Sequence, residues 1–199
     1  MVNTGIYGGS FNPIHNGHIA LARQLLGQGN VEEIWFMVSP QNPLKRHRQM
    51  LPDELRLQLV RQALEQEDGL SACDFEFRLP RPSYTWNTLR ELSNTYPDRT
   101  FTLIIGADNW VNFHHWYKAD ELLAHYPVMV YPRTGSPVNA ETLPKGVTLA
   151  QTARFDVSST EVRRRMEQGE SISGLVPGCV EEWARQQSEQ RQQHIIQDR

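Results

Sequence analysis

The sequence predicts an α/β fold with a doubly wound, mostly parallel sheet, and three observations support this prediction. Short apolar runs alternate with segments of helical period along most of the 199 residues. One run, at 34–38, is apolar at every position, which is typical of a strand that helices cover on both faces. No internal repeat or linker separates two parts, so 1–199 is expected to form one domain with right-handed crossovers.

Six segments are expected to form strands, and turn-forming residues mark the ends of two of them. Gly106 follows one strand and Pro132 follows another. In chain order, the first expected strand ends at 5–7 and the second covers 34–38. The third lies around 73–77, and the last three cover 101–105, 128–131 and 147–150.

Helices are expected between these strands, at 17–26, from Pro52 to Gly69, at 85–96 and at 158–168. Pro52 suits the first position of a helix, and Asp53 and Glu54 favour its N-terminal turn. Gly169 is expected to end the last of these helices. The remaining segment, 181–199, is rich in Gln, Glu and Arg and is expected to be a solvated helix or a frayed tail.

Charge and cysteine content exclude several classes of protein. Twenty basic residues against 23 acidic ones give a net charge of −3, which argues against a nucleic-acid or membrane binder driven by bulk charge. Cys73 and Cys179 form no CxxC motif, so free thiols in a reducing compartment are expected. No signal peptide or membrane span is visible in the sequence. A cytoplasmic protein without nucleic-acid or membrane partners is therefore expected.

The segment GGSFNPIHNGH, at 8–18, lies between an expected strand and an expected helix. Gly8 and Gly9 allow close approach of a ligand to the backbone, and a helix N-terminus attracts anions. His15 and His18 lie on one side of the first helical turn, where they could bind a polyphosphate. Two alternatives are a pair of surface histidines and a metal site, which would need a third ligand.

A second anion site is indicated by SSTEVR, at 158–163. Its hydroxyl groups and Arg163 lie at the start of an expected helix, where they could contact phosphate. The alternative is a plain capping box, because Ser158 and Glu161 have the S-x-x-E spacing.

Together these segments resemble a known superfamily. HNGH matches the HxGH signature of the nucleotidylyltransferases, and 158–163 is similar to their (I)SSTxxR motif. Three further segments resemble the nicotinate-nucleotide adenylyltransferases: NPLK at 42–45, PSYT at 82–85, and IIGAD at 104–108 followed by Phe113 and Trp116. The resemblance covers 5–163 and implies a Rossmann-like nucleotidylyltransferase fold with a short helical C-terminal part.

The resemblance implies transfer of AMP from ATP to nicotinate mononucleotide, which yields deamido-NAD and pyrophosphate in NAD biosynthesis. Mg²⁺ is expected to arrive with ATP rather than in a cage of protein ligands. Two alternatives stay open, a nucleotidylyltransferase with another phosphorylated acceptor and a nucleotide sensor without catalysis. Assembly into a homo-oligomer also stays open.

The residues expected to act fall into three groups. His15, His18 and Arg163 are expected to be catalytic by stabilising charge on the phosphates of ATP. ATP is expected to contact these three and also Gly8, Gly9, Ser10, Phe11, Gly106, Asp108, Ser158 and Ser159. The acceptor is expected to contact Asn42, Lys45, Tyr84, Thr85, Trp116, Tyr117 and Arg133.

Two of these residues have a structural alternative. Trp116 could stack on the pyridinium ring of the acceptor, a cation–π contact worth about 0.5–2 kcal/mol, or it could be a half-buried core aromatic. Asp108 could hold a ribose hydroxyl or a Mg²⁺-bound water, or it could cap a helix at 109–112.

Overall fold

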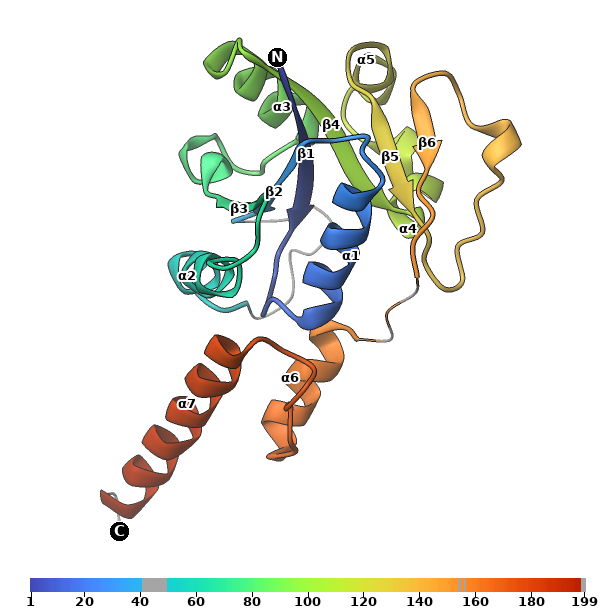
Figure 1. Cartoon of the computed structure of the whole chain (residues 1–199). Coiled ribbons are helices and arrows are strands. Elements are labelled where there is room, and N and C mark those ends of the chain that lie inside the picture. Colours follow the sequence, from blue (N-terminus) through green and yellow to red (C-terminus); the bar gives the residue numbers. More distant parts are fainter. Residues whose placement is uncertain (41–49, 154, 156, 198–199) are drawn as a thin grey trace.

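The computed structural model describes residues 1–40, 50–153, 155 and 157–197. Six strands form one sheet in the order β3-β2-β1-β4-β5-β6, and every neighbouring pair is parallel. The chain runs outward from β1 to β3, then returns to β4 on the other side of β1 and continues to β6 (Figure 1). This doubly wound order confirms the predicted fold class.

Strands and helices alternate along the described parts of the chain. The strands are β1 (Val2–Gly9), β2 (Glu33–Val38), β3 (Leu70–Cys73), β4 (Arg99–Gly106), β5 (Val128–Tyr131) and β6 (Val147–Leu149). The α-helices are α1 (Asn16–Gly27), α2 (Asp53–Ala63), α3 (Thr85–Thr95), α4 (Ala107–Val111), α5 (Ala119–His125), α6 (Ser159–Gln168) and α7 (Gly178–Gln197). Short 3₁₀ helices are η2 (Phe75–Arg78), η3 (Phe113–His115) and η4 (Ala140–Thr142).

Two hydrophobic cores lie on the two faces of the sheet. Successive strand residues alternate between them, so Tyr7 and Phe36 enter one core while Ile6 and Met37 enter the other. The first core also takes side chains from α1, α2, α6 and α7, and the second takes side chains from α3 and α5. Figure 1 shows α1 and α3 on opposite faces of the sheet.

Some predicted boundaries are wrong. The expected strand around 73–77 ends at Cys73, and Phe75 to Arg78 form η2 instead. Helix α2 ends at Ala63, well before Gly69, and Pro52 is its N-cap rather than its first residue. Helix α5 was not predicted. Its seven residues bury only Leu122, which is too weak a periodic pattern to recognise in a sequence.

The C-terminal segment is helical in the part that the structure describes. Helix α7 begins at Gly178, and its first turns pack against α2 before the helix leads away from the sheet (Figure 1). Among the described residues, none of the helices combines the length and apolarity that crossing a bilayer requires.

Candidate active site

The carboxyl ends of β1 and β4 form the switch point of the sheet, because the chain leaves them toward opposite edges. Ligands of doubly wound proteins bind at this point. Two cavities open there, one of about 190 Å³ and one of about 160 Å³, and Tyr131 of β5 lines both. Gly8, Gly9, Tyr84, Thr85, Gly106, Trp116 and Tyr117 line the first cavity, and His15, His18 and Arg133 line the second.

His15 and His18 lie at the start of α1, where the N–H groups of Asn16 and His18 donate to the carbonyls of Leu175 and His15. His15 is the N-cap residue, and its main-chain N–H donates to Nδ1 of His18 at 3.2 Å. The two imidazole rings stack with centroids 3.5 Å apart. A Cβ at Gly17 would lie 3.1 Å from Nδ1 of His15, so a larger residue there would press on this stacked pair. The HNGH spacing therefore builds one paired-imidazole surface.

Burial makes His15 a neutral group. Its side chain lines the smaller cavity, although only 6% of the residue is exposed. Burial, assisted by the positive charge of Arg133, lowers the pKa of His15 to about 3. Nδ1 of His15 is buried and has no hydrogen-bond partner among the described residues. His15 can therefore offer hydrogen bonds to a ligand but not a positive charge.

Arg133 supplies positive charge beside the two histidines. It lines the smaller cavity, donates from Nη2 to the hydroxyl of Tyr131 at 3.1 Å, and lies with Nε 3.8 Å from Oδ1 of Asp108. A Cβ at Gly106 would lie 2.3 Å from that same oxygen, so a larger residue there would displace the Asp108 side chain. The structure thus brings Arg133 next to the expected ATP residues and outside the lining of the larger cavity.

The start of α6 binds the glycine-rich segment. Ser159 donates from Oγ to the carbonyl of Pro13 at 3.0 Å, and Arg163 donates from Nη1 to the carbonyl of Asn12 at 2.7 Å. Ser158 accepts from the N–H of Glu161 at 3.2 Å, so it also caps the helix. The two sequence motifs are therefore joined in one site, although about 145 residues separate them.

Phe11 has a supporting position. It is 2% exposed, and its ring lies edge-on to His18 with centroids 5.0 Å apart. Its φ of 41° is in the left-handed region, and its ring passes close enough to Gly9 to exclude a Cβ there. Phe11 therefore holds the imidazole of His18 from the core side.

Arg56 is a site residue that sequence reasoning missed. Its side chain is fully buried, and it donates to the carbonyls of Ser10 at 2.5 Å, Ser39 at 3.0 Å and Leu51 at 3.1 Å. Its charge is balanced by Asp53, whose Oδ1 lies at 2.6 Å. One guanidinium group thus ties together the segments that follow β1 and β2, which form the rim of the site.

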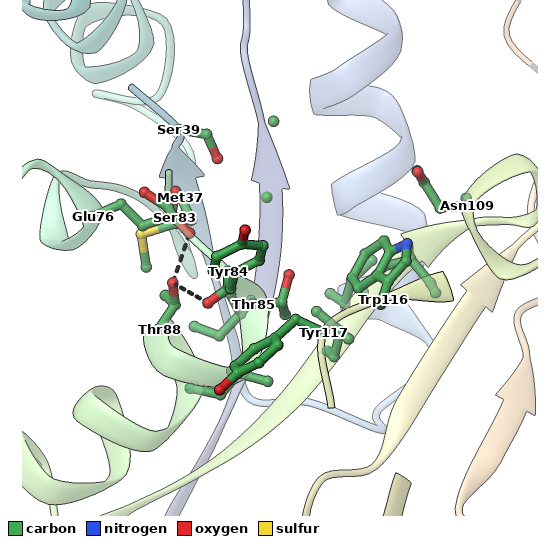
Figure 2. A pocket seen from close by; sticks show the side chains of 18 of the residues that line it. Met37, Ser39, Glu76, Ser83, Tyr84, Thr85, Thr88, Asn109, Trp116 and Tyr117 are labelled. Carbon is green, nitrogen blue, oxygen red and sulfur yellow. Dashed lines mark hydrogen bonds between the residues drawn. The ribbon is translucent and has the colours of Figure 1, made fainter. Parts of the chain in front are cut away.

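The larger cavity is lined by aromatic and hydroxyl side chains. Trp116 and Tyr117 lie on one side of it, and Tyr84 faces Tyr117 with ring centroids 5.0 Å apart (Figure 2). Thr85 is the first residue of α3, so its N–H is at the unpaired end of that helix. No lysine or arginine is among the described residues that line this cavity. Asn42 and Lys45, which were expected to contact the acceptor, lie outside the described residues.

The described residues contain no group of three or more His, Cys, Asp or Glu side chains that could hold a metal ion. Asp108 is the acidic side chain in the first turn of α4, and it faces Arg133. A cation at this site would therefore depend on oxygen ligands brought by a bound molecule.

Comparison with known proteins gives a consistent result. A family model described as cytidylyltransferase-like matches residues 6–165. A relative in Bacteroides thetaiotaomicron, named nicotinate-nucleotide adenylyltransferase, is 45% identical over 93% of this chain and 92% of its own length. The protein of the same name in Porphyromonas gingivalis is 42% identical over 87% of this chain and 89% of its own length.

A solved structure shares the fold. Nicotinic acid mononucleotide adenylyltransferase of Plasmodium falciparum, complexed with NaAD, superposes with a TM-score of 0.76 at 16% identity. The match covers 92% of this chain and 94% of that one. The family model and the sequence relatives show that this chain belongs to the cytidylyltransferase-like family, among its nicotinate-nucleotide adenylyltransferases.

Proposed function

We propose that the protein transfers the AMP moiety of ATP to nicotinate mononucleotide, giving nicotinate adenine dinucleotide and pyrophosphate in NAD biosynthesis. The observation that carries this proposal is the pair of cavities at the switch point. One has paired imidazoles and Arg133 for a polyphosphate, and the other has Trp116 beside the N-terminus of α3. Tyr131 contributes to both, so two ligands bound there would be adjacent.

The reaction needs no nucleophilic residue of the protein. A phosphate oxygen of nicotinate mononucleotide attacks the α-phosphorus of ATP in line, and the bond to the β-phosphate oxygen breaks. The protein contributes position and charge stabilisation, which dominate catalysis of such transfers. We assign His18 to the α-phosphate in the transition state, with neutral His15 as a hydrogen-bond donor and Arg163 on the distal phosphates.

Mg²⁺ enters the site as the complex with ATP in this proposal. The ion would bind phosphate oxygens and water, as Mg²⁺ does in other nucleotide sites, and would neutralise charge on the leaving pyrophosphate. Asp108 is the carboxylate that could accept a hydrogen bond from a water of that ion.

The larger cavity recognises the acceptor through dipoles and an aromatic face. Trp116 is positioned to stack on the pyridinium ring. The N–H of Thr85 is positioned to donate a hydrogen bond to the carboxylate. A carboxamide would present its own N–H to such a donor and leave a buried group unpaired, at a cost of about 1–3 kcal/mol. Nicotinate mononucleotide should therefore be preferred over nicotinamide mononucleotide by at least about tenfold in kcat/KM.

The test is release of pyrophosphate from ATP and Mg²⁺ with a panel of phosphorylated acceptors. We expect rapid release of pyrophosphate with nicotinate mononucleotide. Trp116→Ala should weaken binding of the acid and amide acceptors about equally, because stacking depends on the ring and not on its substituent. Activity with a different acceptor alone would identify another nucleotidylyltransferase. Binding of ATP without turnover of any acceptor would identify a nucleotide sensor.

A further inference from the structure

Glu76 is a buried acidic side chain that the proposed mechanism does not use. It belongs to η2, is 7% exposed and lines the larger cavity with Ser39, Ser83 and Thr88. Figure 2 shows Glu76, Ser83 and Thr88 on one side of the cavity and Trp116 on the other. The acceptor cavity thus contains a carboxyl group in its wall.

Only one of the two carboxyl oxygens of Glu76 is engaged. Oε1 accepts a hydrogen bond from Oγ1 of Thr88 at 2.9 Å. Oε2 is buried and has no hydrogen-bond partner among the described residues, and the same holds for Oγ of Ser83 beside it. Buried polar atoms of native proteins are almost always paired, so these two atoms are suited to a ligand or to water bound with it.

No cation balances the carboxyl group of Glu76 within the described part of the chain. Arg78, on the same 3₁₀ helix, and Arg61 of α2 both pair with Asp74. On α3, Arg90 pairs with Glu91, and on β2, Glu33 pairs with Arg99. The other titratable groups that line the cavity are Tyr84, His115, Tyr117 and Tyr131.

A second carboxylate in this cavity would share its volume with the first. Thr85, whose N–H we assign to the acceptor carboxylate, lines the same cavity of about 190 Å³ as Glu76, so both carboxyl groups would lie in that cavity. Two carboxyl groups that share a dry site do not both stay ionised, and one of them takes up a proton. Burial already raises the pKa of Glu76, while the hydrogen bond from the Thr88 hydroxyl opposes this shift. A carboxyl group on a pyridinium ring is a stronger acid than the alkyl carboxyl group of Glu76, because the cationic ring withdraws electrons, so Glu76 is the group that accepts the proton.

We propose that Glu76 is a specificity-determining residue, which takes up one proton from solvent when an acceptor carboxylate enters the cavity. Its ionised carboxylate becomes a neutral carboxylic acid, and Oε2 or Oε1 then carries a hydrogen that it can donate to the ligand or its water. This inference rests on the proposed function, because it requires an acidic acceptor in this cavity. A neutral amide acceptor would bind without proton uptake.

The sign of the pH dependence follows from linkage. If binding consumes a proton, affinity for the acid acceptor falls as pH rises above the pKa of Glu76 in the free protein, by up to about tenfold for each pH unit. The acceptor phosphate titrates in the same range, but it is common to the acid and amide mononucleotides. The ratio of their affinities therefore isolates the effect of the carboxylate.

The experiment measures Kd and kcat/KM for both mononucleotides between pH 6 and 9, with calorimetry in two buffers of different ionisation enthalpy to count protons. We expect the acid-to-amide ratio to fall with rising pH, and proton uptake to be larger for the acid. In Glu76→Gln, which keeps the shape and cannot titrate, the ratio should become flat. His115→Gln, the control for the exposed histidine of the cavity, should keep the slope of the unmodified protein.

A purely structural role of Glu76 gives different results. If Glu76→Gln flattened the ratio only because it broke the contact with α3, Thr88→Val, which breaks the same contact, should abolish the pH slope as fully. We expect Thr88→Val to retain the slope. Equal proton uptake with acid and amide across the whole range overturns the proposal, and this comparison needs only the unmodified protein. Failure of nicotinate mononucleotide to bind would instead contradict the proposed function.

Discussion

Replacing His18 by alanine tests the contact made chiefly in the transition state. His18 lies at the third position of α1, where its ring is held by Phe11 and His15. We expect kcat to fall by about 100-fold or more, equivalent to roughly 3 kcal/mol, with little change in KM for ATP. Steady-state kinetics measure both constants, and His114→Ala, on the exposed face of η3, is the control. A raised KM with an unchanged kcat would show that His18 binds the ground state.

The neutral state of His15 predicts how stability depends on pH. The pKa of His15 is lowered from 6.5 to about 3, so between these values the unfolded chain binds a proton that the folded chain does not. The free energy of unfolding should therefore fall as pH drops from 6.5 toward 3, by up to about 1.4 kcal/mol for each pH unit.

Urea unfolding at several pH values measures this effect against His15→Asn, which cannot titrate there. As pH decreases, the unfolding free energy of the unmodified protein should fall steadily relative to that of the variant. A difference that stays constant from pH 6.5 to 4 would mean that His15 is protonated equally in both states.

At the scale of elements, Arg56 joins the ends of two strands through helix α2. Arg56→Met would leave the carbonyls of Ser10, Ser39 and Leu51 without their donor and Asp53 without its buried partner. We expect a loss of about 3–5 kcal/mol in unfolding free energy. Arg56→Lys should recover only part of this unfolding free energy, because an ammonium group cannot reproduce the planar arrangement of N–H donors in a guanidinium group.

A matched control for Arg56 lies on the same helix. Arg61 pairs with Asp74 at 3.0 Å but is 58% exposed, so Arg61→Met should cost under about 1 kcal/mol. Thermal unfolding compares stability, and kcat measured well below the melting temperature compares activity of the folded protein. If Arg56→Met retained full kcat, the guanidinium would serve stability alone and would not position the rim of the site.

Elements with a strong pattern are predictable from this sequence, and tertiary contacts decide the others. The apolar runs of β2, β4 and β5 and the capped helix α6 appear where their patterns indicate. After Cys73, two phenylalanines separated by one residue imitate a strand, but the chain turns at Asp74 and forms η2. The local sequence does not show that the chain turns at this edge of the sheet.

The same distinction applies to the site. The HNGH and SSTEVR motifs are visible because each concentrates unusual residues in one short segment. In the sequence, Arg56 resembles an ordinary polar residue of a helix. The one indication that it is buried is its position four residues before the buried Val60, which places both on the core-facing side of α2. The missing partner of Glu76 Oε2 depends on burial and distance, which only a structure supplies.

At the scale of the whole molecule, the first turns of α7 pack against the core and the ion pairs that follow lie on the surface. Val180 is fully buried, and Cys179, Trp183 and Ala184 pack against the same core. Beyond them, Arg185 pairs with Glu182 and Glu189 on the surface, where ion pairs contribute little.

Two truncations test this division. Removing 189–199 should leave the melting temperature and kcat almost unchanged. Removing 178–199 should expose the core beside α2 and lower the melting temperature by about 10 °C, since 1 kcal/mol corresponds to roughly 2–4 °C in a protein of this size. Differential scanning calorimetry measures both, and equal melting temperatures for the two truncated proteins would contradict the packing role.

The contact between α6 and the glycine-rich segment also bears on synthesis of the protein. Arg163 binds the carbonyl of Asn12, 151 positions earlier in the chain, and Ser159 binds that of Pro13. A ribosome adding about 5–20 residues per second takes roughly 8–30 s to span that interval. Throughout that time the nascent chain carries its histidine pair without the arginine that we assign to the distal phosphates. Catalytic competence is therefore one of the last properties that each newly made molecule acquires.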